Sequence, residues 1–285
     1  MIRNLQALTA SSQRLSADFK APEPHVPWRQ LAPAASCHVV SMGLLPQTIP
    51  IMNAAALNAT TMVDSDHPAV IAFAREHARG ADERERAVAL YYAVRDGFRY
   101  DPYRIDMSVH GLKASTVLAN GYGWCVPKAA LLAAACRAAG IPARVGYADV
   151  RNHLTTERMR RNMGTDLFVW HGYTDIWLDG AWVKSTPAFN LELCERFGLL
   201  PLEFDGRADS IYHPFDRAGN RHMEYVTLHG AFDDVPRQRI LDGFRVHYPN
   251  MPLDALTQDG DFMADAAAER AAEHPPQPPA ARAAR

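Results

Sequence analysis

Cysteine is scarce in this chain, with four residues among 285, and no two of them form a Cys-x-x-Cys pair. A disulfide scaffold and a zinc ribbon both need closely spaced cysteines, so neither is expected. We therefore expect reduced thiols and a cytoplasmic location. The four cysteines are Cys37, Cys125, Cys136 and Cys194.

Long apolar runs and a large excess of one charge are also missing. The apolar stretch at residues 39–57 is broken by Pro46, Pro50 and Asn53, so no membrane-spanning segment is expected. The N-terminus lacks the uninterrupted apolar segment that a secretory signal requires. A formal net charge of -2 gives no reason to expect nucleic acid or an acidic membrane surface as a partner.

The distribution of folding signals divides the chain into four segments. Residues 1–60 have scattered prolines and no sustained periodicity, which indicates a partly ordered N-terminal extension. Residues 61–190 carry the strongest signals and form the expected core, and residues 191–260 continue the same domain. Residues 261–285 are rich in alanine, arginine and proline, so we expect a disordered tail.

Within the core, periodicity and capping residues predict a series of helices followed by strands. Helices are expected at residues 69–78, 82–95 and 126–139, and a strand at residues 141–147. Residues 151–164 are polar and rich in arginine, so we predict a solvated loop or short helix outside the core.

Cys125 stands at the start of the third predicted helix, in the sequence Gly121-Tyr122-Gly123-Trp124-Cys125. Unpaired backbone amides and the positive end of the helix dipole favour a thiolate at that place. The glycines permit a tight turn and leave amides open to an acyl oxygen. The alternative, a buried apolar cysteine, is our interpretation of Cys37, Cys136 and Cys194. Cys125 is thus the candidate nucleophile.

His171 lies on the first strand of a predicted hairpin and is the candidate base for the cysteine. The expected strands, residues 166–178 and 181–188, flank Asp179-Gly180, a strong two-residue turn signal. Counting outward from this turn sets Tyr173 opposite Thr186 and His171 opposite Ala188. The diagonal neighbour of His171 is then Thr186, whose hydroxyl could orient the imidazole.

The group that orients His171 stays open among several side chains. Asp175 lies two steps along the same face and opposite Lys184, so we expect it to form a cross-strand ion pair instead. Asn190 could supply an amide, and a carboxylate after Pro201 is a further alternative.

These residues resemble the transglutaminase-like superfamily over about residues 64–190. The resemblance implies an α+β fold related to papain-like cysteine proteases, with helices packed on an antiparallel sheet and a cysteine, a histidine and an aspartate at the active site. Cys125 and His171 match the first two, whereas Thr186 stands where the family has the aspartate. The motifs that carry the resemblance are Tyr91-Tyr92-Ala93-Val94-Arg95-Asp96, Gly123-Trp124-Cys125-Val126-Pro127-Lys128-Ala129 and Arg137-Ala138-Ala139-Gly140-Ile141-Pro142-Ala143-Arg144.

The resemblance implies a cysteine enzyme that acts on amide bonds through a thioester, with hydrolysis of a peptide or small amide as the expected outcome. Acyl transfer to an amine and a catalytically impaired binding module are the alternatives. No cofactor or metal is expected, because the acidic residues and histidines of residues 203–224 match no metal-binding motif. We expect Tyr122, Trp124 and Tyr173 to contact the substrate.

Overall fold

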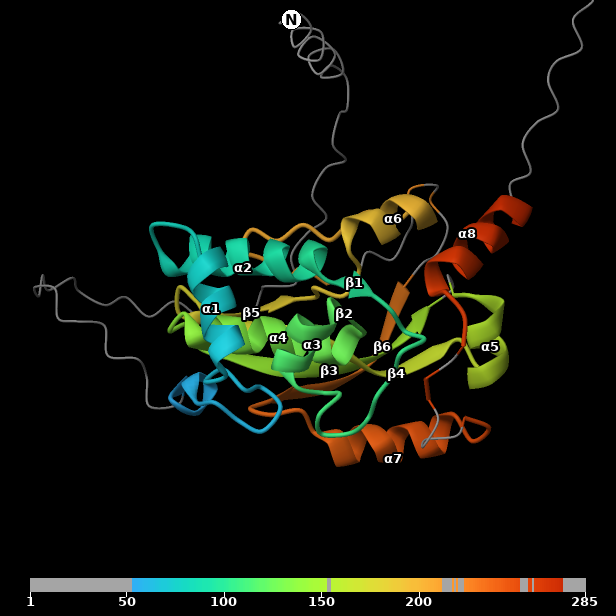
Figure 1. Ribbon diagram of the computed structural model, residues 1–285, viewed down its shortest axis with the longest axis horizontal. Coiled ribbons are helices and arrows are strands. Elements are labelled where there is room, and N and C mark those ends of the chain that lie inside the picture. Colours follow the sequence, from blue (N-terminus) through green and yellow to red (C-terminus); the bar gives the residue numbers. More distant parts are fainter. Residues whose placement is uncertain are drawn as a thin grey trace, which may run out of the picture. The chain divides into compact units, whose positions relative to one another are not determined.

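The computed structural model describes residues 53–152, 155–211, 217, 219, 223–251, 256–257 and 259–273. Helices and strands are mixed along this part of the chain (Figure 1). The helices are the short 3-10 turn η2 (Ala55–Leu57), α1 (Pro68–His77), α2 (Glu83–Gly97), α3 (Ala114–Asn120), α4 (Cys125–Ala138), α5 (Glu157–Met163), α6 (Leu191–Phe197), α7 (Arg237–His247) and α8 (Phe262–Glu273). The strands are β1 (Arg99–Tyr100), β2 (Tyr122–Gly123), β3 (Ala143–Asn152), β4 (Leu167–Leu178), β5 (Ala181–Ser185) and β6 (Met223–Phe232).

Helix α4 lies on an antiparallel sheet whose strand order is β5-β4-β3-β6. It contacts β4 and β3 on one side, while α1, α2 and α3 pack around it (Figure 1). Every residue from Cys125 to Arg137 is buried, and five of these thirteen are alanines that let neighbours approach the backbone. A helix that is apolar on all sides belongs in the core. The α+β arrangement expected from the sequence is confirmed.

The β4–β5 hairpin follows the predicted register near its turn. Asp179 and Gly180 both have positive φ, of 50° and 84°, as a two-residue hairpin turn requires. Leu178 faces Ala181, and the pairing continues outward until Thr174 faces Ser185. The predicted register is confirmed over these five pairs.

Beyond Ser185 the predicted pairing is wrong, because the chain leaves the ladder. Thr186 donates its backbone N–H to the Ser210 carbonyl at 3.1 Å, and Pro187 has no N–H to offer a neighbouring strand. Two residues after Thr186, the carbonyl of Ala188 accepts a hydrogen bond from Lys128 Nζ at 2.9 Å. The pairs of Tyr173 with Thr186 and of His171 with Ala188 are therefore not formed.

The predicted ion pair of Asp175 with Lys184 is also wrong. The two residues face each other in the ladder, but Asp175 Oδ2 binds Arg144 at 2.8 Å, and Lys184 Nζ lies 3.4 Å from Asp209. Arg144 comes from the adjacent strand β3 and also lies over the Trp182 ring, 3.7 Å from its centroid. Both partners come from segments that the hairpin count could not include.

The polar segment at residues 151–164 contains the helix α5, and one face of this helix is buried in the core. Met159 and Met163 are buried although the neighbouring arginines are exposed. Their spacing of four residues places both on one face of the helix. The expectation that this segment lies outside the core was wrong for that face.

The expected disordered tail begins with a helix. Helix α8 covers residues 262–273, and the rings of Phe262 and Tyr103 meet at a centroid distance of 5.4 Å. Burial of Phe262, Met263 and Ala266 explains why this segment is ordered. Residues 274–285 and most of the expected N-terminal extension, with Cys37, lie outside the described residues.

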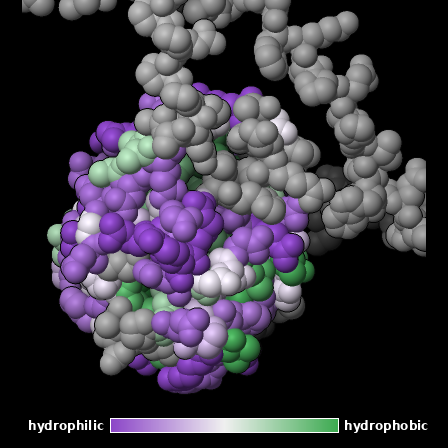
Figure 2. Space-filling view, turned by 90° about the vertical axis from the view of Figure 1, so that its right-hand side faces the viewer, coloured by the Kyte–Doolittle hydropathy of each residue, from purple (hydrophilic) through white to green (hydrophobic). Residues whose placement is uncertain are grey.

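The face drawn in Figure 2 is mostly hydrophilic, with apolar residues in small separate patches. Scattered apolar residues of this kind are normal on a protein surface. Among the helices of the described residues, none is long and apolar enough to cross a membrane.

Candidate active site

Cys125 is the first residue of α4, and the turn before it sets its position. Gly121 ends α3 with φ of 72°, a left-handed conformation that suits glycine. The short strand β2 then pairs with β1, and Trp124 is the extended residue that precedes the helix. Trp124 is the N-cap residue, and its side chain makes no capping hydrogen bond. It therefore does not occupy the backbone amides of the first turn of α4.

The Cys125 thiol is buried, with 7% of the residue exposed. Burial raises the pKa of the thiol to about 12, although backbone hydrogen bonds from Gly172 and Val126 act in the opposite direction. The sequence analysis expected the helix start to favour the thiolate. In this structure desolvation outweighs the helix start, so the resting sulfur is a thiol.

His171 lies on β4 and is equally buried, with 7% exposed. Its Nδ1 lies 3.2 Å from the Gly172 carbonyl oxygen. Because a carbonyl only accepts, Nδ1 carries the proton and Nε2 is the basic nitrogen. Burial lowers the pKa of His171 to about 4, with the bond to the Gly172 carbonyl opposing that change. At neutral pH the imidazole is therefore uncharged and able to accept a proton.

The two residues meet at one apolar pocket, with a cavity volume of about 50 Å³. Among the described residues, the structure gives no hydrogen bond between Cys125 Sγ and the imidazole of His171. The pairing with β5 covers only Thr174–Leu178 of β4, so the pocket lies where β5 no longer flanks that strand. Its wall includes Tyr100, Trp124, Met159, Met163, Phe168, Phe244 and Tyr248.

Sequence reasoning missed most of this wall. Met159 and Met163 were assigned to a solvated segment, although their i, i+4 spacing was a usable signal. Tyr248 Oη donates to the Leu167 carbonyl at 3.0 Å and accepts from the Val169 N–H at 2.7 Å. These two bonds fix α7 against β4, and no local pattern in the sequence indicates them.

A β-bulge immediately precedes His171. Trp170 has φ of 58°, and the β3–β4 register shifts between Ala148 and Val150. Asp149 Oδ1 accepts the Trp170 N–H at 3.0 Å and lies 2.6 Å from His229 Nε2. The Trp170 ring stacks on the His229 ring at 4.1 Å with an interplanar angle of 6°. Bulges beside functional sites change the direction of neighbouring side chains. We infer that this cluster sets the direction in which the His171 side chain points from β4.

Alternation along β4 separates Gly172 and Thr174 from Tyr173. Thr174 Oγ1 donates to the Ala129 carbonyl of α4 at 2.9 Å, and a Cβ on Gly172 would lie 3.0 Å from the Cys125 carbonyl oxygen. Tyr173 packs on Gly146 and belongs to a small apolar cluster with Ala148, Val150, Leu202 and Met223. The structure does not bring Tyr173, expected to contact substrate, into the Cys125 pocket.

Thr186 is buried, with 1% exposed. Its carbonyl accepts from Tyr91 Oη at 3.3 Å, but its own Oγ1 has no hydrogen-bond partner within the described structure. Asn190, the alternative orienting group, accepts the Tyr100 N–H at 3.1 Å through Oδ1. Neither side chain forms a hydrogen bond to His171 in the part of the chain that is described.

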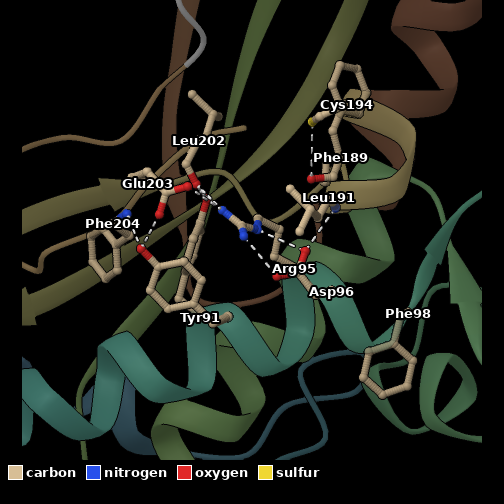
Figure 3. A network of polar contacts seen from close by, with 12 residues as sticks. Tyr91, Arg95, Asp96, Phe98, Phe189, Leu191, Cys194, Leu202, Glu203 and Phe204 are labelled. Carbon is tan, nitrogen blue, oxygen red and sulfur yellow. Dashed lines mark hydrogen bonds and ion pairs between the residues drawn. The ribbon is translucent and has the colours of Figure 1, made fainter. Parts of the chain in front are cut away.

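A polar network attaches the segment after β5 to α2 (Figure 3). Arg95 donates to the Leu202 carbonyl at 2.7 Å and pairs with Asp96 at 2.8 Å. Asp96 in turn accepts the Leu191 N–H at 2.9 Å, and Arg95 also reaches Glu203 at 3.4 Å. The network binds Leu191 at one end and Leu202 and Glu203 at the other end of the segment that contains α6.

Lys128, one turn into α4 from Cys125, is completely buried. Its Nζ donates to the carbonyls of Arg95 at 2.9 Å, Phe98 at 2.6 Å and Ala188 at 2.9 Å. Burial lowers the pKa of Lys128 to about 7, while the nearby Asp96 raises it. The side chain joins α4 to the end of α2 and to the chain that follows β5.

A second, polar cavity of about 220 Å³ lies on the other side of Trp124. Trp124 lines both this cavity and the Cys125 pocket, and Tyr122 lines the polar cavity only. Tyr122 and Trp124, two of the three residues expected to contact substrate, therefore line a cavity that shares Trp124 with the Cys125 pocket. Within the described residues, no group of three His, Cys, Asp or Glu side chains could hold a metal ion.

Comparison with known proteins identifies the core. Residues 71–187 match the model of the transglutaminase-like superfamily, and the resemblance drawn from the sequence is confirmed over that range. Curated proteins give no significant match.

Two of the solved structures that match this chain do so at low identity. A candidate cysteine protease from Cytophaga hutchinsonii is 17% identical, with a TM-score of 0.38, over 66% of this chain and 61% of its own. A candidate protease from Parabacteroides distasonis is 21% identical, with a TM-score of 0.33, over 49% of this chain and 27% of its own. The matched part therefore spans less than two thirds of either neighbour.

Proposed function

We propose that this chain, which carries a transglutaminase-like core over residues 71–187, is a cysteine enzyme that cleaves amide bonds through a thioester on Cys125. The observation that carries the proposal is the placement of Cys125, at the start of α4, in one pocket with His171 of β4. A cysteine at a helix start, with a neutral imidazole able to accept its proton, is an arrangement that suits a cysteine nucleophile.

The reaction begins from a neutral pair of thiol and imidazole. His171 Nε2 takes the thiol proton as Sγ attacks the amide carbon, forming the carbon–sulfur bond and an oxyanion. The open amides at the start of α4 stabilise that oxyanion. The imidazolium then returns its proton to the amine as the carbon–nitrogen bond breaks. Water, deprotonated by the same nitrogen, attacks the thioester; the carbon–sulfur bond then breaks, the acid is released, and the imidazolium returns its proton to Sγ.

Hydrolysis of a peptide or small amide is the outcome we propose, with Cys125, His171 and Thr186 as the catalytic group. Thr186 stands where the family has its aspartate, so the role we propose for it is orientation of the imidazole through its hydroxyl, a bond that the described residues do not form in this structure. The described cysteines are free thiols, which supports a cytoplasmic location.

A second candidate, a binding module that has lost catalysis, is favoured by Thr186 itself. Its Oγ1 is buried and makes no hydrogen bond within the described residues. A protein of this kind would retain the pocket but would not react at Cys125.

An activity-based electrophile, such as a dipeptidyl vinyl sulfone, separates the two candidates. The enzyme is expected to be labelled stoichiometrically at Cys125, with no label in Cys125→Ser and slower labelling in His171→Ala. Cys136→Ala is the matched control, because Cys136 lies in the same helix, is fully buried and lines neither cavity. Labelling that shows no preference for Cys125 would leave the binding module as the better account.

A further inference from the structure

The polar cavity beside Trp124 is about four times as large as the cavity that contains Cys125, at about 220 Å³ against 50 Å³. A cavity needs about 10–15 Å³ in this measure to hold one water molecule, so the cysteine pocket, at about 50 Å³, admits only a small group. A substrate larger than that needs further room, and the polar cavity adjoins the nucleophile's own neighbour.

Side chains of both charges line this cavity. Arg104 and Asp106 come from the loop between β1 and α3, together with His110. Asp106 Oδ1 accepts the Ser108 N–H at 2.8 Å, and the described residues offer its Oδ2 no hydrogen bond. A cavity with a guanidinium and a carboxylate suits a ligand that carries an anionic and a cationic group of its own.

Trp124 gives a second indication that a ligand belongs here. The residue is 5% exposed, and its Nε1–H has no hydrogen-bond partner among the described residues. Buried polar groups are rarely left unsatisfied, and those that are require an explanation. A ligand that spans the two cavities would supply the missing acceptor after a small shift of the ring.

We propose that the polar cavity binds a zwitterionic group of dipeptide size, with Arg104 and His110 facing its carboxylate and Asp106 facing its ammonium. The inference rests on the proposed function, since it makes this cavity the specificity site of the amide-cleaving enzyme. The substrate class is then a short peptide with free termini. A long protein segment or a fully apolar amide is excluded.

Arg99 provides a matched control for Arg104. Both guanidinium groups lie over the Tyr122 ring, 6.0 Å and 5.7 Å from its centroid, and both reach Asp101 Oδ2, at 3.1 Å and 3.4 Å. Their side chains are 46% and 49% exposed. Only Arg104 lines the cavity, so the pair differs in the property under test.

The test is calorimetric binding of alanylalanine to the full chain carrying Cys125→Ala, which cannot turn over a substrate. Blocking either terminus, by N-acetylation or C-terminal amidation, is expected to weaken binding about tenfold or more. Arg104→Ala should abolish the difference between the free and amidated dipeptides, and Asp106→Asn the difference between the free and acetylated ones. Arg99→Ala should bind like the parent.

Three results would overturn the inference: equal binding of free and blocked dipeptides, equal losses in Arg99→Ala and Arg104→Ala, or no binding at millimolar concentration. The outcome is separable from the proposed function, because binding to the Cys125→Ala chain needs no chemistry. Selective labelling of Cys125 without dipeptide binding would remove this inference and leave the amide-cleaving enzyme in place.

Discussion

The reactivity of Cys125 should rise with pH across the whole range in which the protein is folded. Burial raises the pKa of its thiol to about 12, whereas an unperturbed cysteine titrates near 8.5. At pH 7.5 the thiolate fraction is then roughly 3,000-fold smaller than for a free cysteine. Alkylation by iodoacetamide, which reacts with the thiolate, should therefore be much slower than that of a free cysteine, although a thiolate of higher pKa is the stronger nucleophile and offsets part of this factor.

The assay measures the alkylation rate at Cys125 by peptide mapping between pH 6 and pH 10. The logarithm of the rate is expected to rise by about one for each pH step, without a plateau. His171→Ala should leave the shape of this profile unchanged, because burial lowers the pKa of His171 to about 4 and the resting imidazole carries no charge to stabilise a thiolate.

A plateau in the alkylation rate, with a midpoint below pH 8 that disappears in His171→Ala, would contradict a resting thiol at Cys125. It would show a resting thiolate–imidazolium pair, in which attraction to the imidazolium and the helix start outweighs desolvation. Cys136 serves as the internal control: burial also raises the pKa of its thiol to about 12, but the residue is 0% exposed where Cys125 is 7% exposed, so it should remain unmodified throughout.

Three further predictions concern the groups around the pair. Lys128→Met should lower the free energy of unfolding in urea by about 3 kcal/mol or more, because three buried carbonyls lose their donor; a loss below about 1 kcal/mol would contradict this. Thr186→Asp should raise the pKa of His171 by about 1–3 in an NMR titration, since a nearby carboxylate favours the imidazolium; an unchanged value would point away from Thr186 as the orienting residue. Asp149→Ala should slow vinyl sulfone labelling about tenfold, whereas Asp149→Asn, which keeps an acceptor for the Trp170 N–H, should retain most of the rate. Equal labelling rates in the two variants would show that this hydrogen bond does not affect the reactivity of Cys125.

Local chemistry predicted the parts of the site that depend on adjacent residues. The Asp179-Gly180 turn determines which residues of β4 and β5 face each other, so the register could be counted. The glycine turn before Cys125 likewise indicated a nucleophile at a helix start, and α4 begins at that residue. Both depend on interactions within a few residues.

The errors arise where distant segments compete for the same atoms. Ser210 and Lys128 bind the chain after Ser185 and draw it away from β4. Arg144 binds Asp175 from another strand, and Asp149 meets His229 across the sheet. No count along one hairpin could include these partners.

Intact-mass spectrometry during turnover of a peptide ester shows whether Cys125 forms a thioester. The wild-type chain is expected to gain the mass of one acyl group, mapped to Cys125 and lost as water is consumed. Cys125→Ala should show no adduct, His171→Ala should acylate more slowly, and Cys136→Ala should match the wild type. An acyl group found on another residue, or the same adduct in Cys125→Ala, would contradict the account.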